Sequence, residues 1–386
     1  MTTHPDPAAR VLLVSHYYPP HLGGVENVVR GEAEHLAAAG HDVTVLTTSP
    51  GAAPGHSLEQ GVQVHRTATW NGIESRTGVP FPVPAPTLLA RAWRLVRAAD
   101  VVHLHDALYP TSWAAAVCCR LLGRRLVVTQ HVDLVAHPNA LVRAVQRLVY
   151  ASAGRFVLRS AAAVLVLNDR VHAFARALAG EGAPIELVAN AVDTDRFRPA
   201  PGPAHRRAAR AAFGLPPDAV IGVFVGRFVP KKGFDTLLQA RTPAVHLVLA
   251  GGPAPAGAPP DCTFVGSLSP DRLAQLYRAA DLFVLPSQAE GFPLTVQEAM
   301  ASGLPVLTTD DPAYACYGLD RDLVGLLAPG AQALRHELER VAADPGLRAR
   351  MGAYSHHLAT TRFGWTAHLR ALGTAYGLTA EQQVQR

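Results

Sequence analysis

Strand-like and helical segments alternate along almost the whole of this 386-residue chain, and this alternation limits the fold more than any other feature. Short runs rich in Val, Leu and Ile predict strands. In the first half they lie at 11–15, 42–47, 62–66, 100–105, 125–129, 163–167 and 185–188, with helical patterns between most of them. Strands joined through helices run parallel with right-handed crossovers. The first half is therefore predicted to form a doubly wound α/β sheet.

The alternation stops once and then restarts. Residues 198–203 are rich in proline, which breaks regular structure, so we interpret them as a linker. A second set of strands follows at 220–225, 245–249, 263–265, 281–285 and 305–308. We therefore expect two doubly wound α/β domains, residues 1–197 and 198–362. A last helical segment, 363–386, follows a break near Phe363.

The composition agrees with two globular domains in the cytoplasm. Hydrophobic residues make up 49% of the chain, enough for two cores. No run reaches the roughly 18 apolar residues of a membrane-spanning helix, and the first ten residues lack the apolar core of a signal peptide. We interpret the four cysteines as reduced structural residues.

Two carboxylates, Glu290 and Glu298, flank a predicted turn between the strand at 281–285 and a helix that begins near Thr295. In open α/β sheets, ligands bind beyond the carboxyl ends of the strands, where the start of a helix attracts an anion. A phosphate at this turn places Glu290 beside a group attached to the phosphate. Glu298, farther along the helix, then lies where a ribose can reach. The turn therefore indicates a nucleotide-sugar site.

A basic segment follows the strand at 220–225, with Arg227 and Lys232 on either side of a proline turn. Arginine supplies a planar fork of donors and lysine a compact charge. The pair suits a diphosphate whose negative charge increases as a sugar leaves. Because Lys231 is also present, a basic surface cluster is the alternative interpretation.

Two further segments follow predicted strands. Gly23 and Gly24 open a helix after the first strand, and glycine there lets the backbone approach a ligand closely. An ordinary strand–helix turn is the alternative. His131 follows the strand at 125–129, and a histidine at that position is either structural or part of a site.

Four segments of the chain, in order, resemble motifs of the retaining family-4 glycosyltransferases, which have the GT-B fold of two Rossmann-like domains facing each other across a cleft. They are Gly23-Gly24-Val25-Glu26, the segment 190–197, the segment 226–233, and Glu290 to Glu298 followed by residues 299–306. The resemblance covers roughly residues 10 to 375. One two-glutamate spacing recurs by chance, but four ordered motifs in matching contexts rarely do.

The resemblance implies roles for the site residues. Glu290 is expected to contact the transferred sugar and Glu298 to hold the ribose hydroxyls, while the segment 130–133 resembles the strand-end histidine motif. The predicted catalytic residues are His131, Glu290, Arg227 and Lys232. The predicted donor-binding residues are Gly23, Gly24, Arg227, Lys232, Glu290, Phe292, Pro293, Leu294, Thr295 and Glu298. Because proline has no N–H, the amides of Leu294 and Thr295 are the ones left for phosphate.

This chain departs from the family pattern at four positions. Pro293 and Thr295 stand where the family often has glycine and proline, Val132 stands in place of the glycine that usually follows the histidine, and Ala191 replaces a common glycine. These changes put the local backbone shape in question. The resemblance still implies transfer with retention of configuration, by front-face attack in which the departing diphosphate helps take the acceptor proton. It also implies domain closure, no metal or other cofactor, and a last helix that crosses back to the first domain.

The acceptor site is less well marked. We predict Tyr17, Tyr18 and His105 as acceptor-binding residues, with the irregular stretch 70–86 as a second candidate surface. His103 and His105 share one face of a strand, as a metal-binding pair would. The sequence shows only the adjacent Asp106 beside them, so we expect no metal site.

The partners follow from this interpretation. We expect a UDP- or GDP-linked hexose as donor and a glycan, a lipid-linked molecule or a small molecule as acceptor, with no nucleic acid. Arginines at 143, 147, 155 and 159 recur along a predicted helix, and the net charge is +5. A solvated arginine face is the preferred interpretation, and weak contact with the inner face of the membrane is the alternative. The rival functions are a GT-B phosphorylase or epimerase and a non-catalytic nucleotide-sugar-binding protein.

Overall fold

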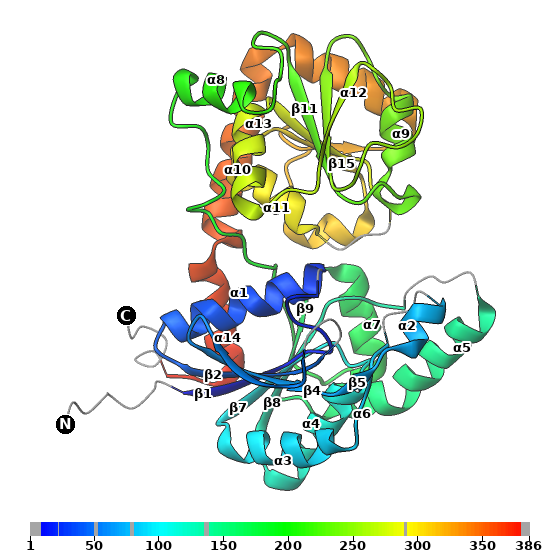
Figure 1. Ribbon diagram of the computed structural model, residues 1–386, viewed down its shortest axis with the longest axis vertical. Helices are drawn as coiled ribbons and strands as arrows, with labels where there is room; N and C mark the ends of the chain where they lie inside the picture. The colour runs from blue at the N-terminus through cyan, green and yellow to red at the C-terminus, as the bar shows by residue number, and fades with distance from the viewer. Residues whose placement is uncertain are drawn as a thin grey trace, which may run out of the picture. The chain divides into compact units, whose positions relative to one another are not determined.

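The computed structural model describes residues 9–21, 23–49, 53–77, 81–134, 139–288 and 292–379. The chain divides into two compact units (Figure 1). Unit 1 comprises residues 1–189 and 368–386, and unit 2 comprises residues 190–367. The predicted divisions, after residues 197 and 362, differ from these by eight and five residues.

Unit 1 is built on an eight-stranded sheet of order β10-β9-β8-β7-β1-β2-β4-β3. All neighbouring strands are parallel except β3 and β4. The strands are β1 (Arg10–Val14), β2 (Asp42–Thr48), β3 (Gly55–Glu59), β4 (Val62–Thr67), β7 (Val101–His105), β8 (Arg125–Gln130), β9 (Ala163–Val166) and β10 (Ile185–Leu187). A short antiparallel pair, β5 (Thr69–Trp70) and β6 (Val83–Pro84), stands apart from this sheet.

Helices cover both faces of this sheet. They are α1 (Gly24–Ala38), α2 (Gly72–Thr77), α3 (Thr87–Ala98), α4 (Pro110–Leu122), α5 (Ala140–Val149), α6 (Arg155–Ser160), α7 (Asp169–Ala179) and most of α14 (Trp365–Tyr376). One apolar core joins the sheet to α3, α4, α6 and α7, and the other joins it to α1 and α14. Leu372 and Tyr376 of α14 lie in the second core, so the end of the chain completes unit 1.

Unit 2 has a six-stranded parallel sheet of order β13-β12-β11-β14-β15-β16. Its strands are β11 (Ile221–Val225), β12 (His246–Ala250), β13 (Cys262–Gly266), β14 (Leu282–Leu285), β15 (Val306–Thr309) and β16 (Gly325–Leu327). Its helices are α8 (Pro203–Ala211), α9 (Phe234–Gln239), α10 (Pro270–Ala279), α11 (Leu294–Ala301), α12 (Ala331–Ala343) and α13 (Pro345–Leu358). The strand order reverses between β11 and β14, which is the place where open α/β sheets bind ligands.

The predicted strands are present, with ends that differ by a residue or two. The strands β3, β5, β6 and β16 were not predicted. The helix expected over 141–160 is interrupted by a π-helical turn, η1 (Tyr150–Gly154), between α5 and α6. This turn changes the register of the side chains, so the arginines do not form one continuous stripe.

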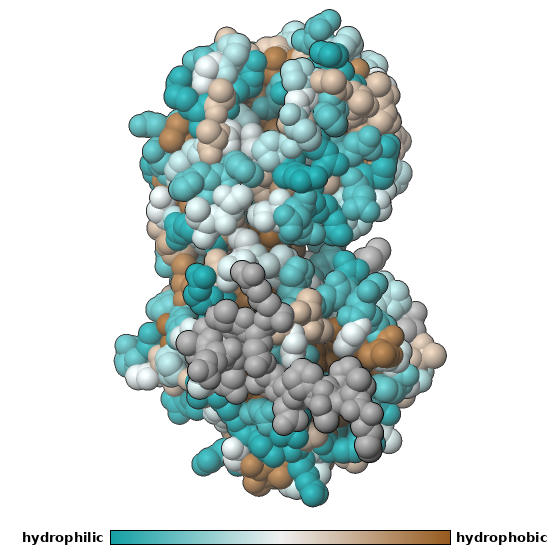
Figure 2. All heavy atoms as spheres, turned by 90° about the vertical axis from the view of Figure 1, so that its left-hand side faces the viewer, coloured by the Kyte–Doolittle hydropathy of each residue, from teal (hydrophilic) through white to brown (hydrophobic). Residues whose placement is uncertain are grey.

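The described surface carries mainly hydrophilic side chains on the face shown in Figure 2, and hydrophobic ones form only small patches. Within the described residues, no helix is both long and apolar enough to span a bilayer. No disulfide joins any of the four cysteines, which all lie in the described part of the chain, and Cys118 and Cys119 are buried.

Candidate active site

The basic loop of unit 2 is packed against the carboxyl end of β14. Gly233 has a left-handed backbone (φ 72°), and a Cβ atom there would lie 2.0 Å from the carbonyl oxygen of Pro286. Glycine is therefore required for this close approach. The carbonyl oxygen of Lys231 also accepts a hydrogen bond from the N–H of Gln288 at 2.8 Å. These contacts hold the loop between β11 and α9 at the switch point of the sheet.

The cations that were predicted to bind diphosphate lie on this loop. Arg227 is exposed, and Lys232 is half-buried. The aliphatic stem of Lys232 runs beside Gly226, where a Cβ atom would lie 3.6 Å from its Cδ atom. Lys231 is exposed as well. The geometry places all three cations on one short loop beside the carboxyl end of β14.

Helix α11 begins just after Pro293, whose backbone is extended (φ −62°, ψ 140°). The N–H groups of Val296 and Gln297 both donate to the carbonyl oxygen of Pro293. The N–H groups of Leu294 and Thr295 precede these bonds and belong to the free first turn of the helix. A free first turn carries a partial positive charge, which suits an anion.

Glu298 is half-buried on α11, and its Oε2 atom accepts a hydrogen bond from the Tyr277 hydroxyl at 3.1 Å. Burial raises the pKa of Glu298 to about 7, although the Tyr277 bond and the charge of Arg196 act in the opposite direction. A ligand that donates hydrogen bonds to this carboxylate would stabilise its ionised form.

The structure does not place Glu290 and Phe292 at the donor site. Glu290 lies outside the described residues, so its role stays a prediction. Phe292 is 3% exposed and stacks on Tyr317 at a ring distance of 4.4 Å, with Phe363 also in contact. This burial argues against direct donor contact by Phe292, whose packing instead anchors the turn before α11.

Sequence analysis missed a hollow at the same edge of the sheet. Its lining includes Thr236, Gln288, Thr308, Thr309 and Gly330, and its other residues are apolar: Pro286, Leu327, Ala328, Pro329 and Leu334. Gln288 follows β14, Thr308 and Thr309 end β15, and Thr236 and Gly330 lie at the start of the neighbouring helices α9 and α12. A position at or after the end of a buried parallel strand was the signal that could have identified the first three.

In unit 1, the carboxyl ends of β7 and β8 bring His105, Asp106 and His131 together. Asp106 has a left-handed backbone (φ 66°), and its Oδ1 atom accepts a hydrogen bond from the N–H of His131 at 2.8 Å. Burial raises the pKa of Asp106 to about 7, although the backbone N–H groups of His131 and Val132 lower it in part. Asp106 therefore anchors the His131 segment, a role that sequence analysis did not assign.

His131 is 5% exposed, and its Nε2 atom lies 3.0 Å from Nδ1 of His105. Burial lowers the pKa of His131 to about 4, with the Glu32 carboxylate acting in the opposite direction. Burial also lowers the pKa of His105 well below its usual value. Both rings are therefore neutral at pH 7, and each has one donor and one acceptor nitrogen.

The two glycines of the glycine loop, Gly23 and Gly24, differ in the space around them. A Cβ atom at Gly23 would lie 2.1 Å from Oε2 of Glu26, whereas a Cβ atom at Gly24 would meet nothing within 4 Å. Packing within unit 1 thus does not require glycine at Gly24. A requirement for glycine there would come from a ligand.

The predicted acceptor residues are buried. Tyr17 is 1% exposed, and its hydroxyl bonds to Asn71 at 3.1 Å and to Glu74. Tyr18 is 4% exposed and lies in the core that contains α1, which argues against the predicted contact with an acceptor. His105 is fully buried. Burial leaves Tyr17 and His105 as supports of the edge of the sheet in this structure.

The second candidate surface, residues 70–86, is partly core. Phe81 packs against the apolar core beside Tyr109 and Trp113. Trp70 is 57% exposed, with the Arg76 guanidinium 5.7 Å from the centre of its ring. Residues 78–80 lie outside the described part of the chain. Of the two aromatic residues named in this stretch, Trp70 is the one with an exposed face.

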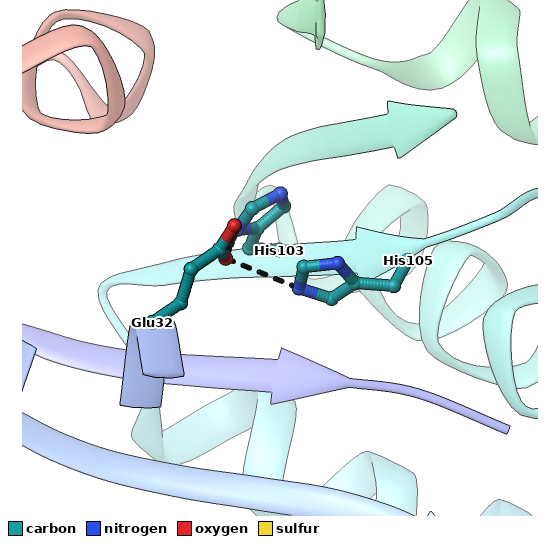
Figure 3. A group of neighbouring side chains, drawn as sticks. All are labelled: Glu32, His103 and His105. Atoms are coloured by element: carbon teal, nitrogen blue, oxygen red, sulfur yellow. Dashed lines mark ion pairs between the residues drawn. The ribbon is translucent and has the colours of Figure 1, made fainter. Parts of the chain in front are cut away.

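The structure adds a carboxylate to the histidine pair of β7. Glu32, on α1, is 1% exposed, and its Oε2 atom lies 3.4 Å from Nε2 of His105 and 3.6 Å from Nδ1 of His103 (Figure 3). Our premise that only Asp106 accompanies these histidines was therefore wrong. The spacing of the three side chains is close enough for a metal ion to be considered.

Known proteins resemble both units. The model of the Glycosyltransferase Family 4 matches residues 22–196, and that of the Glycosyl transferases group 1 matches residues 205–357. A D-inositol 3-phosphate glycosyltransferase from Mycobacterium tuberculosis is 31% identical, and the alignment covers 96% of this chain and 83% of that protein. One from Streptomyces bingchenggensis is 37% identical over 50% of this chain and 48% of that protein, about half the length of each.

Among solved structures, Anabaena Alr3699/HepE in complex with UDP and glucose has a TM-score of 0.73 and 18% identity. The match covers 95% of this chain and 99% of that chain, so it concerns the fold of the whole molecule. The family matches, the near-complete relative and the shared architecture agree. The chain therefore belongs to the family-4 glycosyltransferases and is a glycosyltransferase with the GT-B fold.

Proposed function

We propose that the protein transfers a hexose from a nucleoside diphosphate sugar to a hydroxyl group, with retention of the anomeric configuration. The observation that carries this proposal is the carboxyl edge of unit 2. There a cationic loop, held by Gly233 against β14, and the half-buried Glu298 of α11 lie at the ends of the two strands that form the switch point. The binding of UDP and glucose by Alr3699/HepE, which has the same fold, supports a nucleotide-sugar donor.

Each group of this edge suits one part of such a donor. Arg227 and Lys232 would bind the diphosphate, and the free N–H groups of Leu294 and Thr295 would add neutral donors. Glu298 would accept hydrogen bonds from the two ribose hydroxyls. The cations would also stabilise the charge that develops on the diphosphate as the sugar leaves, which is the main source of catalysis in this proposal. With two cations supplying the countercharge, the proposed reaction needs no metal ion.

The groups of unit 1 suit the sugar better than the phosphate. His131 is neutral, so it would bind a sugar hydroxyl by hydrogen bonding instead of attracting the diphosphate. The proposal assigns no protein nucleophile. The acceptor hydroxyl attacks from the face that the diphosphate leaves, and the diphosphate oxygen takes the acceptor proton. Glu290 is proposed to contact the transferred sugar.

The acceptor class is open between a small molecule, a glycan and a lipid-linked molecule. The relatives named D-inositol 3-phosphate glycosyltransferases support a small phosphorylated polyol as the first acceptor to test. The purified protein would be assayed for nucleotide release with UDP- and GDP-sugars, with and without D-inositol 3-phosphate. The configuration of the product would be read from its anomeric proton coupling.

The outcomes separate the proposal from its rivals. Acceptor-dependent release of nucleotide with a retained configuration would support the proposal. Formation of a sugar 1-phosphate only with inorganic phosphate would identify a phosphorylase. Donor binding without turnover for any acceptor would identify a binding protein. An inverted product would overturn the retaining mechanism.

We also propose weak contact between unit 1 and the inner face of the membrane, on a different basis from the arginines. Arg155 and Arg159 both donate to the carbonyl oxygen of Leu178, so they are engaged within the unit. The outer face of α5 is instead apolar. Leu141, Val145 and Leu148, which share one face by their helical spacing, are 70%, 50% and 69% exposed, whereas the polar Gln146 is buried. A helix with its apolar residues outside and a polar residue inside suits a position in a membrane interface.

A further inference from the structure

A chain of buried polar side chains leads from α1 and α14 to His131. Glu32 lies at its centre, with Oε1 3.0 Å from Nε2 of His368 and Oε2 3.4 Å from Nε2 of His105. His105 continues the chain, because its Nδ1 atom lies 3.0 Å from Nε2 of His131. Figure 3 shows the Glu32 carboxylate directed at the two histidines of β7. The proposed function uses only the last member of this chain.

Hydrogen-bond accounting assigns the proton of His368. Its Nδ1 atom lies 2.9 Å from the carbonyl oxygen of Ala189, which only accepts, so Nδ1 carries a proton. Its Nε2 atom faces the carboxylate, and a second proton must lie between them. The arrangement is therefore a buried ion pair between protonated His368 and ionised Glu32. The histidines around Glu32 also outweigh the effect of its burial and hold its pKa below the usual range.

The remaining oxygen of Glu32 decides the state of His105. Among the described residues, Oε2 of Glu32 and Nε2 of His105 are both buried without an ordinary hydrogen-bond partner, and they face each other. A buried polar atom left unpaired costs about 1–3 kcal/mol, so this contact is the one that can satisfy both. A carboxylate attracts an N–H group and repels a nitrogen lone pair. Nε2 of His105 therefore carries the proton, and Nδ1 is left as an acceptor.

The hydrogen bond between His105 and His131 assigns the proton of His131 in the same way. Because Nδ1 of His105 accepts, Nε2 of His131 must donate, and the proton of the neutral His131 ring is placed on Nε2. Nδ1 of His131 is then an acceptor, and no described residue donates a hydrogen bond to it. We propose that Glu32 is a positioning residue: through His105 it leaves Nδ1 of His131 as an acceptor for a hydroxyl group of the transferred sugar.

A metal ion at Glu32, His103 and His105 is the main rival. The separations of 3.4 and 3.6 Å resemble those between the ligands of a zinc ion. However, both nitrogens of His103 are already engaged, by the Tyr376 hydroxyl at 2.9 Å and the Thr129 hydroxyl at 2.7 Å. His368 occupies the other oxygen of Glu32. Only two donor atoms remain, whereas structural zinc sites use four and catalytic ones three.

The test measures histidine tautomers in the free protein, by long-range proton–nitrogen NMR after labelling histidine with ¹⁵N. His105→Gln and His131→Gln would assign the signals. In the wild type, both rings should carry their proton on Nε2. Glu32→Met removes the acceptor but keeps the length of the side chain, and it should convert much of the His131 population to the other tautomer. Glu32→Gln should keep the wild-type tautomers, because its amide oxygen can face His105 while its NH₂ group donates to His368.

Tyr376→Phe is the matched control, because it removes a buried hydrogen bond to His103 without touching the chain to His131. It should leave the tautomer of His131 unchanged. Thermal unfolding would establish that each variant is folded, and the inference can be tested on Glu32→Gln even where Glu32→Met fails to fold. An unchanged His131 tautomer in folded Glu32→Met would overturn the inference, as would a changed tautomer in folded Glu32→Gln. Stoichiometric zinc in the wild type that is lost in Glu32→Met would overturn it in favour of a metal site.

The ligand of His131 in this inference rests on the proposed function, but the tautomer does not. In a transfer assay, Glu32→Met should lower kcat about tenfold with little change in KM for the donor, and Glu32→Gln should stay close to the wild type. A protein with the expected tautomers but no transferase activity would refute the proposed function alone. Active enzyme with unaltered kcat in folded Glu32→Met would refute the positioning role alone.

Discussion

The affinity for a nucleotide sugar should depend on pH through Glu298. Burial raises the pKa of this carboxyl to about 7 in the free protein, so it is largely protonated at pH 6 and largely ionised at pH 8. Ribose hydroxyls donate hydrogen bonds more strongly to the ionised form, which makes that form the binding-competent one. The affinity should therefore fall as the pH is lowered through 7. This direction is the one expected for an acid whose pKa falls when its ligand binds.

The magnitude follows from the ionised fraction. With a pKa of about 7, roughly one tenth of Glu298 is ionised at pH 6 and roughly nine tenths at pH 8. Binding that required the ionised form would weaken about tenfold from pH 8 to pH 6, because apparent affinity scales with the competent fraction. The stability of the folded protein should change in the opposite direction. It should decrease as the pH rises from about 4.5 to 7, because the pKa of Glu298 is raised in the folded state and its ionisation there is destabilising.

Isothermal titration with an intact UDP-sugar at pH 6, 7 and 8 would measure the effect. An intact nucleotide sugar is preferable to UDP, whose terminal phosphate titrates in the same range. Asp106 also has a pKa of about 7, so the wild type must be compared with Glu298→Gln. Glutamine keeps the size of the side chain and cannot ionise, and its affinity should be weaker and nearly independent of pH. Equal pH dependence in both proteins would refute the role of Glu298.

Four further predictions follow from the sites described above. Glu290→Ala should lower turnover tenfold to hundredfold while donor binding changes little, since a hydrogen bond to an ionised group contributes about 1.5–3 kcal/mol. Steady-state kinetics would measure the turnover, and isothermal titration would measure donor binding. Wild-type kinetics in the variant would remove the assignment of Glu290 to the sugar. Activity should persist in excess chelator, because Arg227 and Lys232 supply the countercharge; loss that manganese or magnesium restores would contradict this. Gly233→Ala should lower the free energy of unfolding by more than about 2 kcal/mol, measured by heat or urea. The control is Gly257→Ala, which should cost about 1 kcal/mol, because Gly257 has a similar φ of 73° but open space around it. Equal effects would mean that the contact with Pro286 is unimportant. Anionic vesicles should bind the wild type more than the double variant Leu141→Gln, Leu148→Gln in co-sedimentation, with the 71%-exposed Leu58→Gln as control; equal binding by all three would leave the outer face of α5 without a membrane role.

The fold could be predicted because buried parallel strands are nearly continuous apolar runs. The four residues of β14, Leu-Phe-Val-Leu, are buried on both faces, and such a run has few other interpretations. β3 (Gly-His-Ser-Leu-Glu) was missed because it is a mostly exposed antiparallel edge strand with one large apolar residue. The membrane argument from arginines failed at the π-helical turn, because a spacing of four residues describes one face only while the helix stays regular.

The candidate site was predictable where a residue follows its own strand. Arg227, Glu298 and His131 were named from such positions, and all three lie at the carboxyl edge of a sheet or on the helix that follows it. Glu32 was missed because its partners are distant in the chain, with His368 lying 336 positions away. One signal was present. Val28, Glu32 and Leu36 follow each other at intervals of four on α1, so a carboxylate occupies the apolar stripe of the helix.

The two units place different electrostatics at equivalent edges. Unit 2 presents three cations, Arg227, Lys231 and Lys232, on the loop after β11. Unit 1 buries the histidines at its carboxyl edge, and burial lowers the pKa of His16 to about 3 and that of His131 to about 4, so that both are neutral. In the proposed reaction, neutral rings would offer nitrogen lone pairs to the hydroxyls of a sugar. The buried ion pair between Glu32 and His368 fits this arrangement, because it orients the neutral rings without adding net charge beside them.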